Sequence, residues 1–120
     1  MSNGFDQDGE DLVIEPRREG GAIVVALRGE VTVFSSPTLR DRLHQIADGH
    51  RGRIVMDLAE TTYVDSSGVA TFVEMLKMVR RNEGDLVLAG ISDRVRGVFE
   101  IARLADVFAM AETVEEALKP

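Results

Sequence analysis

Residues 53–68, RIVMDLAETTYVDSSG, decide the fold class of this chain. The segment Arg53–Leu58 is mostly apolar, which is typical of a strand buried inside a sheet. The polar residues Glu60–Thr62 predict a loop after this strand. Asp65-Ser66-Ser67-Gly68 then offers side chains that cap helices, and a helix is expected to run from there to about Arg81. A buried strand that leads through a loop into a helix predicts a parallel sheet.

The sequence before this segment predicts two further strands and one helix. Leu12–Pro16 alternates weakly with polar residues, as expected for an edge strand, and Glu19-Gly20-Gly21 indicates a turn. Ala22–Leu27 is a nearly continuous apolar run, which predicts a buried strand joined to the first by a hairpin. Ser35-Ser36-Pro37 predicts a helix start with a serine hydroxyl as the cap, and Gly49 is expected to end this helix.

The sequence after the segment continues the alternation of strands and helices. Leu86–Ala89 predicts another buried strand, Val107-Phe108 predicts a short strand, and Thr113 is expected to cap a last helix. Ser92 is expected to cap the helix between these two strands. The residues predicted for the inner face of that helix are Val95, Val98, Phe99 and Ala102.

The predicted order of elements is β-β-α-β-α-β-α-β-α. Strands that alternate with helices imply a mostly parallel sheet with right-handed crossovers, here of about four to five strands with four helices. The first strand is expected to run antiparallel at one edge. We therefore expect a single α/β domain over residues 11–120, preceded by a flexible tail over residues 1–10.

Composition and charge argue against several classes of function. The 120 residues include 14 basic and 21 acidic side chains, a net charge of −7, which disfavours binding to nucleic acid or to an anionic membrane. The lack of cysteine excludes disulfides, thiol catalysis and cysteine-based zinc sites. The sequence shows no apolar core of a signal peptide and no apolar run near the roughly 20 residues of a membrane span. We expect a cytoplasmic protein with no cofactor and no metal, whose partner is another protein.

Ser66 lies where the predicted loop enters the helix, and two interpretations of it stay open. One is that its hydroxyl caps the helix, which is worth about 1 kcal/mol. The other is that the hydroxyl is presented to another protein, because Ser66 and Ser67 are doubled where one cap suffices and Gly68 removes bulk. Ser-Ser-Gly is a poor helix former, but it leaves a hydroxyl that a kinase can reach.

Phosphorylation of Ser66 would change binding without unfolding the domain. A phosphate adds nearly two negative charges, which the free amides and the dipole of a helix N-terminus tolerate. Asp65 places a like charge beside it. A partner that docks on the neutral hydroxyl would then meet a desolvated charge and lose affinity.

Val64-Asp65-Ser66-Ser67-Gly68, at the point where a helix follows a buried strand, resembles the phosphorylation motif of anti-sigma-factor antagonists, the STAS-domain family. The resemblance spans about residues 12–118. It includes Leu27-Arg28-Gly29-Glu30 after the second strand, the helix with Ser92…Val95…Val98-Phe99, and Ala102-Arg103-Leu104 before the last strand. Asp-Ser-Ser-Gly alone is a moderate signal, and its order and context make it a strong one.

The resemblance implies a partner switch. The unphosphorylated protein would bind an anti-sigma factor that is itself a serine kinase with a GHKL-type ATP site, and would so free a sigma factor. The kinase would phosphorylate the serine directly after the aspartate, here Ser66, and a PP2C-type phosphatase would reset it. Asp65 would orient the loop or meet the kinase, and Ser67 would cap or donate locally. The loop Glu30–Ser36 would lie beside Ser66 and share the docking surface.

The residues expected to bind the partner are Glu30, Thr32, Val33, Phe34, Asp65, Ser67 and Gly68. Thr32 departs from the family, because many members carry an aspartate at this position. The apolar residues Val33 and Phe34 follow it. They form either an interface anchor or, in the case of Phe34, a staple that packs onto the following helix.

Two other functions are compatible with parts of the sequence. A STAS accessory or scaffold subunit of a transporter or a stressosome-like complex needs no phosphorylation, but such relatives often lack the Asp-Ser-Ser-Gly signature. A hydrolase that used Ser66 would need a base, and neither His44 nor His50 falls where one is expected. Both histidines are expected to be surface residues. With no Gly-x-Ser-x-Gly motif in the chain, we expect a binding protein rather than an enzyme.

Overall fold

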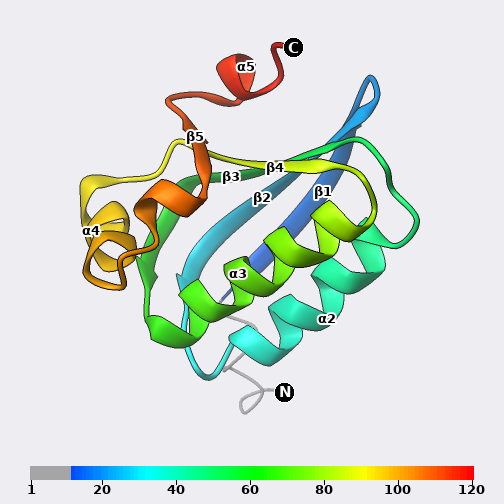
Figure 1. The fold of residues 1–120 in the computed structure, drawn as a ribbon. Coiled ribbons are helices and arrows are strands. Elements are labelled where there is room, and N and C mark those ends of the chain that lie inside the picture. The colour runs from blue at the N-terminus through cyan, green and yellow to red at the C-terminus, as the bar shows by residue number, and fades with distance from the viewer. Residues whose placement is uncertain (1–11) are drawn as a thin grey trace.

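The structure is a computed structural model that describes residues 12–120 (Figure 1). Its strands are β1 (Val13–Glu19), β2 (Ala22–Val31), β3 (Arg53–Val64), β4 (Asp85–Ala89) and β5 (Ala109–Ala111). Its helices are α2 (Ser36–Ala47), α3 (Ser66–Arg81), α4 (Asp93–Ile101) and α5 (Val114–Ala117), with a short 3₁₀ turn at Ala105–Val107. The tail predicted for residues 1–10 lies outside the described residues.

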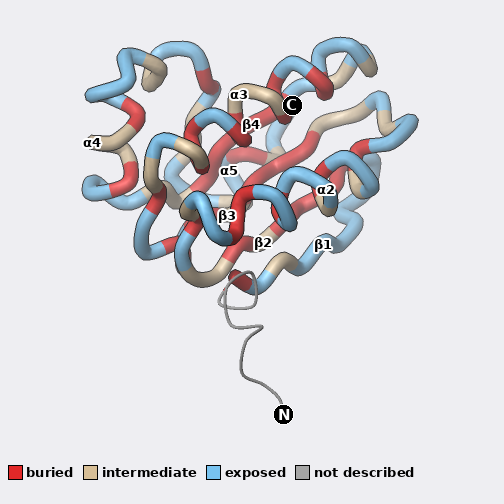
Figure 2. The backbone as a smooth tube through the Cα atoms, turned by 90° about the horizontal axis from the view of Figure 1, so that it is seen from below, coloured by how far each residue is buried: buried red, intermediate tan, exposed pale blue. Residues whose placement is uncertain are grey.

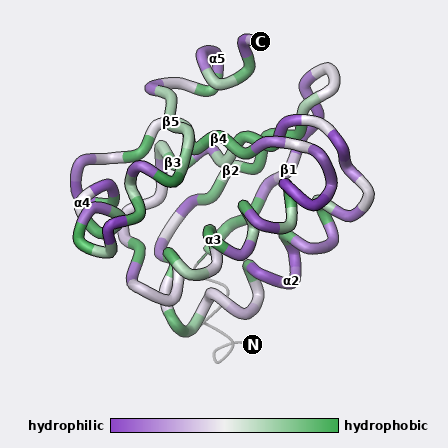
Figure 3. The backbone as a smooth tube through the Cα atoms, viewed as in Figure 1, coloured by the Kyte–Doolittle hydropathy of each residue, from purple (hydrophilic) through white to green (hydrophobic). Residues whose placement is uncertain are grey.

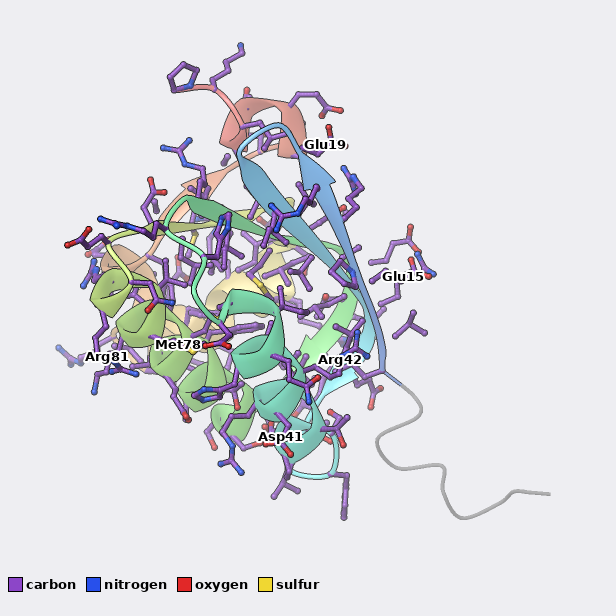
Figure 4. The ribbon with its side chains drawn as sticks, turned by 90° about the vertical axis from the view of Figure 1, so that its right-hand side faces the viewer. Glu15, Glu19, Asp41, Arg42, Met78 and Arg81 are labelled. Carbon is purple, nitrogen blue, oxygen red and sulfur yellow. The ribbon has the colours of Figure 1, made fainter. Side chains whose placement is uncertain are left out.

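The five strands follow one another across one sheet in the order β1-β2-β3-β4-β5. β1 pairs with β2 antiparallel, and the other neighbouring strands are parallel. Pro16 is tolerated in β1 because this strand lies at the edge of the sheet. Glu15 and Glu19 lie along the same strand at the outside of the molecule (Figure 4), where charge discourages pairing with another chain. The prediction of a mostly parallel sheet with an antiparallel edge strand and four helices is therefore confirmed for residues 12–120.

Alternate strand residues face two cores on opposite sides of the sheet. Right-handed crossovers between sequential parallel strands place α2, α3 and α4 on the same side, where Met56 joins a large cluster with Phe72 and Phe99. Val55 faces the other side, in a smaller cluster with Ala117 of α5. Figure 2 shows that burial concentrates along the central strands, and Figure 3 shows apolar residues along the same path. No helix within residues 12–120 has the length and apolar character needed to cross a membrane.

β3 is longer than predicted, because Glu60–Thr62 belongs to the strand rather than to a loop. Two irregularities in the pairing of β2 with β3 each place one extra residue in β3. Such bulges bend a strand and let polar residues stay within the ladder. The buried Thr61 hydroxyl, for example, donates a hydrogen bond of 2.8 Å to the Leu27 carbonyl. Because β3 extends to Val64, Asp65 follows directly on a strand.

The last strand lies later in the chain than predicted. Val107 belongs to the 3₁₀ turn, and β5 consists of Ala109–Ala111. Phe108 lies between the turn and β5 and is buried. Its ring meets Phe99 edge-on, with 5.4 Å between the ring centroids. The apolar character that suggested a strand at Val107-Phe108 therefore reflects packing of one aromatic side chain.

Two side chains near helix ends also differ from the prediction. Ala102 is exposed rather than on the inner face of α4, because the helix ends at Ile101. Ser35 precedes α2 but its hydroxyl does not cap the helix. Instead, this hydroxyl donates to the Glu30 carbonyl and accepts from the Thr32 N–H, both at 2.9 Å. Ser35 therefore holds the loop before α2 in shape.

Candidate functional site

Asp65 caps α3, and the interpretation of Ser66 as the cap is wrong. The Oδ1 atom of Asp65 accepts hydrogen bonds from the backbone N–H groups of Ser67 at 2.9 Å and Gly68 at 3.1 Å. It also accepts from the Ser67 hydroxyl at 2.6 Å. Extended backbone angles at Asp65 are those of a residue that flanks a helix. The helix start therefore obtains its acceptor from the aspartate, and neither serine hydroxyl is needed for that role.

Ser66 is the first residue of α3 and is exposed. Within residues 12–120, the side-chain hydrogen bonds at this helix start involve Asp65, Ser67 and Ser36 and leave the Ser66 hydroxyl uncommitted. A kinase or a docking partner can therefore reach this hydroxyl without breaking a contact that holds the fold.

Gly68 is buried, and its role is one of packing rather than of access to Ser66. A Cβ atom built on Gly68 would lie 2.8 Å from a methyl carbon of Val31 and 2.8 Å from a methyl carbon of Val64. It would also lie 3.0 Å from the Val31 carbonyl oxygen. Glycine allows α3 to approach the ends of β2 and β3 closely, and this close approach fixes the position of Ser66 relative to the two strand ends.

The loop that follows β2 lies beside the start of α3, as Figure 1 shows at the lower end of the molecule. The Val33 N–H donates to Oδ2 of Asp65 at 3.0 Å, and the Asp65 N–H donates to the Val31 carbonyl at 3.0 Å. The Ser36 and Ser67 hydroxyl oxygens are 3.0 Å apart. The structure thus brings the loop predicted over Glu30–Ser36 into contact with the predicted phosphorylation motif.

Phe34 is 70% exposed and Val33 is 60% exposed, so the interpretation of Phe34 as a staple packed on α2 is wrong. Hydrogen bonds within the loop shape it instead: the Thr32 hydroxyl accepts from the Phe34 N–H at 3.2 Å, and the Thr32 carbonyl accepts from the Ser35 N–H at 3.0 Å. Glu30 is exposed at the end of β2. The loop therefore presents two apolar side chains and one carboxylate to solvent close to Ser66.

The carboxylate of Asp65 ionises more readily than an ordinary aspartate. Its partial burial opposes the charge and is the largest single influence, but hydrogen bonds from the Ser67 hydroxyl and from backbone N–H groups outweigh it, so the pKa of Asp65 is lowered. The charged carboxylate can only accept, which makes the Ser67 hydroxyl the donor in their contact. The Ser67 oxygen must then accept from Ser36, so the hydrogen bonds run from α2 to α3 to Asp65.

Sequence reasoning missed two residues of this region. Ser36 was expected only to start α2, but its hydroxyl contacts Ser67; the doubling of Ser35-Ser36, like that of Ser66-Ser67, is the signal that could have found it. Tyr63 pairs with Glu30 across β2 and β3 and is 42% exposed. An aromatic side chain so close to the motif is a signal of binding.

Nothing within residues 12–120 gathers three or more side chains able to hold a metal ion. His44 is exposed on α2, with its Nε2 atom 3.0 Å from the Glu74 carboxylate on α3. His50 is half-buried, with Nε2 3.3 Å from the Arg53 carbonyl. His44 is a surface residue as predicted, whereas His50 also packs against its own turn.

The chain is similar to known proteins of one domain family. The family model of the STAS domain matches residues 13–117. The anti-sigma-B factor antagonist of Listeria monocytogenes is 36% identical over 92 residues, which cover 75% of this chain and 79% of the relative. The anti-sigma-B factor antagonist of Bacillus subtilis is 33% identical over 106 residues, which cover 88% of this chain and 95% of the relative.

Solved structures show the same fold. The anti-sigma factor antagonist SpoIIAA in its unphosphorylated form aligns with a TM-score of 0.76 and 24% identity, over 88% of this chain and 93% of its own. The phosphorylated form of Bacillus SpoIIAA aligns with a TM-score of 0.68 and 23% identity, over 88% and 96% of the two chains. The two solved structures show the fold, whereas the family assignment rests on the relatives above 30% identity and on the match to the STAS model. The chain belongs to the STAS-domain family of anti-sigma-factor antagonists.

Proposed function

We propose that this chain is a partner-switching regulator. In its unphosphorylated form it binds an anti-sigma factor that is also a serine kinase of the GHKL ATPase type, and so frees a sigma factor. The kinase phosphorylates Ser66 and the complex dissociates, and a PP2C-type phosphatase restores the binding form. The chain acts in the cytoplasm as a binding protein and not as an enzyme.

The observation that carries this proposal is the position of the Ser66 hydroxyl. Asp65 supplies the cap of α3 and Ser67 supplies the contact to α2, so Ser66 alone of the three is free for chemistry. A hydroxyl with a structural task would be costly to modify. An exposed hydroxyl without one can gain and lose phosphate while the fold stays intact.

The surface around Ser66 supports docking of a protein. Val33 and Phe34 provide exposed apolar area, and apolar or aromatic side chains anchor many interfaces. Glu30 and Thr32 precede this pair in the chain and would set partner choice. Buried Gly68 contributes by fixing the position of α3 rather than by direct contact.

A phosphate on Ser66 would be tolerated by this chain but not by a complex. The dipole of α3 favours a nearby anion at its N-terminus, where the N–H groups of Ser67 and Gly68 already donate to Asp65. The same dianion would lie beside the Asp65 carboxylate, and a docked partner would have to desolvate both charges. SpoIIAA, which has the same fold, has been solved in an unphosphorylated and in a phosphorylated form.

The test is capture of an ATP-binding partner by the unmodified full chain, followed by incubation with ATP and mass spectrometry. We expect phosphate in the peptide that contains Ser66, none in Ser66→Ala, and loss of the complex for Ser66→Asp. The control is Ser92→Asp, which places the same charge at the exposed start of α4 and should leave binding unchanged. Aspartate can take over the cap that the Ser92 hydroxyl provides by accepting from the Val95 N–H. Phosphate on Ser66→Ala, or full binding by Ser66→Asp, would contradict the proposal.

A further inference from the structure

Asp65 divides its two carboxylate oxygens between two segments of the chain. Oδ1 holds the start of α3 through Ser67 and Gly68, whereas Oδ2 accepts the Val33 N–H at 3.0 Å from the loop after β2. The two segments are more than thirty residues apart in sequence. One carboxylate therefore connects the helix that begins at Ser66 to the loop that carries Phe34.

The tip of that loop has few other attachments among residues 12–120. The Phe34 N–H bonds to Thr32 inside the loop itself, and Ser35 bonds to Thr32 and Glu30 of the same segment. Both apolar side chains at the tip are mostly exposed, Val33 at 60% and Phe34 at 70%. The hydrogen bond from Val33 to Asp65 ties the tip to the start of α3, and the Ser36–Ser67 contact joins α3 to the first residue of α2 just after the tip.

We propose that phosphorylation of Ser66 loosens the Val33–Phe34 loop through Asp65. This inference rests on the proposed function, because it requires Ser66 to be the phosphoacceptor. The phosphate oxygens and the Asp65 carboxylate would compete for the same N–H groups of Ser67 and Gly68. Like charges on adjacent residues also repel each other.

The carboxylate is the weaker competitor, because it carries one charge and two oxygens against nearly two charges and three oxygens of the phosphate. As the carboxylate moves away from the helix start, Oδ2 leaves the Val33 N–H and the loop tip loses its tie to α3. A docking partner would then lose the fixed position of Phe34 as well as the neutral hydroxyl. Asp65 is thus a positioning residue, through which phosphorylation of Ser66 would change the position of Val33 and Phe34.

The experiment is amide hydrogen exchange, followed by NMR, on the full chain with phosphoserine incorporated at position 66 during synthesis, so that no kinase is needed. We expect exchange at the Val33 N–H to become several-fold faster than in the unmodified chain. Exchange at Leu39, whose N–H bonds to the Ser35 carbonyl in α2, should be unchanged. Phosphoserine at Ser92, the exposed cap of α4 whose hydroxyl accepts from the Val95 N–H, is the control for added charge at another helix start and should leave Val33 unaffected.

A second variant tests the route. Asp65→Asn in the unmodified chain keeps an oxygen for the helix cap but places an amide N–H₂ opposite the Val33 N–H, so Val33 exchange should rise and phosphoserine 66 should add little. Unchanged Val33 exchange with phosphoserine 66, or a full additional increase in Asp65→Asn, would overturn the coupling. Loss of partner binding with unchanged Val33 exchange would overturn it while leaving the proposed switch standing.

Discussion

Substitution of Gly68 by alanine tests the close contact that sets the position of Ser66. The new methyl group would lie 2.8 Å from methyl carbons of both Val31 and Val64, and 3.0 Å from a carbonyl oxygen. The two valines are fully buried, so neither can move aside without disturbing the core. Overpacking of this kind costs about 1–3 kcal/mol. Alanine would gain at most about 1 kcal/mol over glycine as a helix former, and less in the first turn.

The balance predicts that Gly68→Ala lowers the free energy of unfolding by about 1–2 kcal/mol. Gly97 on α4 is the matched control, since a Cβ atom there would meet nothing within 4 Å. Gly97→Ala should therefore raise the free energy of unfolding by up to about 1 kcal/mol.

Urea unfolding of both variants, followed by circular dichroism, measures the two changes, and the slopes should match that of the parent chain. Opposite signs for the same chemical substitution would separate packing from helix propensity. If Gly68→Ala were as stable as the parent, the contact between α3 and the ends of β2 and β3 would not be as tight as described, and the account of Gly68 would be wrong.

Three further predictions concern the cap, the loop and the C-terminal helix. Asp65→Ala should lower the free energy of unfolding by about 1–2 kcal/mol at neutral pH. Because folding lowers the pKa of Asp65, the carboxylate stabilises the fold fully above the ordinary aspartate pKa, and this stabilisation is lost as the pH falls through the lowered pKa. Urea unfolding curves of parent and variant should therefore converge in acid. Phe34→Ala should leave the free energy of unfolding within about 0.5 kcal/mol, because the ring is exposed, yet weaken partner binding about tenfold or more in calorimetry. Arg53→Met should free α5, because Arg53 donates to the carbonyls of Ala117 and Lys119, both at 2.7 Å, and limited proteolysis should then cut the C-terminus faster; equal rates would contradict this role.

The alternation of strands and helices could be predicted from the sequence because each element buries one face, and hydrophobic periodicity records that burial directly. Glu60–Thr62 could not be assigned in this way. These polar residues stay in β3 because bulges in the pairing with β2 accommodate them, and pairing between distant strands leaves no local pattern. The shift of the last strand from Val107-Phe108 to Ala109–Ala111 has a similar cause, since Phe108 is buried against Phe99 on another element.

In the site, too, the sequence predicts local features, whereas features that depend on tertiary contacts cannot be predicted from it. The motif at residues 65–68 located the helix start, but three successive side chains there are able to cap a helix. Asp65 takes that role because its N–H bonds to Val31 at the end of β2, which sets its backbone as the last extended residue. The exposure of Phe34 was equally beyond local reasoning. It follows from a loop whose backbone is held by Asp65 and Ser35, so that the side chains point outward.

The order of the four residues matters more than their composition. Had the modified serine occupied the position of Asp65, no carboxylate would connect the start of α3 to the Val33 N–H. Had it occupied the position of Ser67, phosphate would break the hydrogen bond to Ser36 and push α2 from α3. Of the four residues, Ser66 is the one that is exposed and takes part in neither contact. A charge added there acts on neighbours through Asp65 and on partners directly, while the buried contacts of Gly68 keep the helix in place.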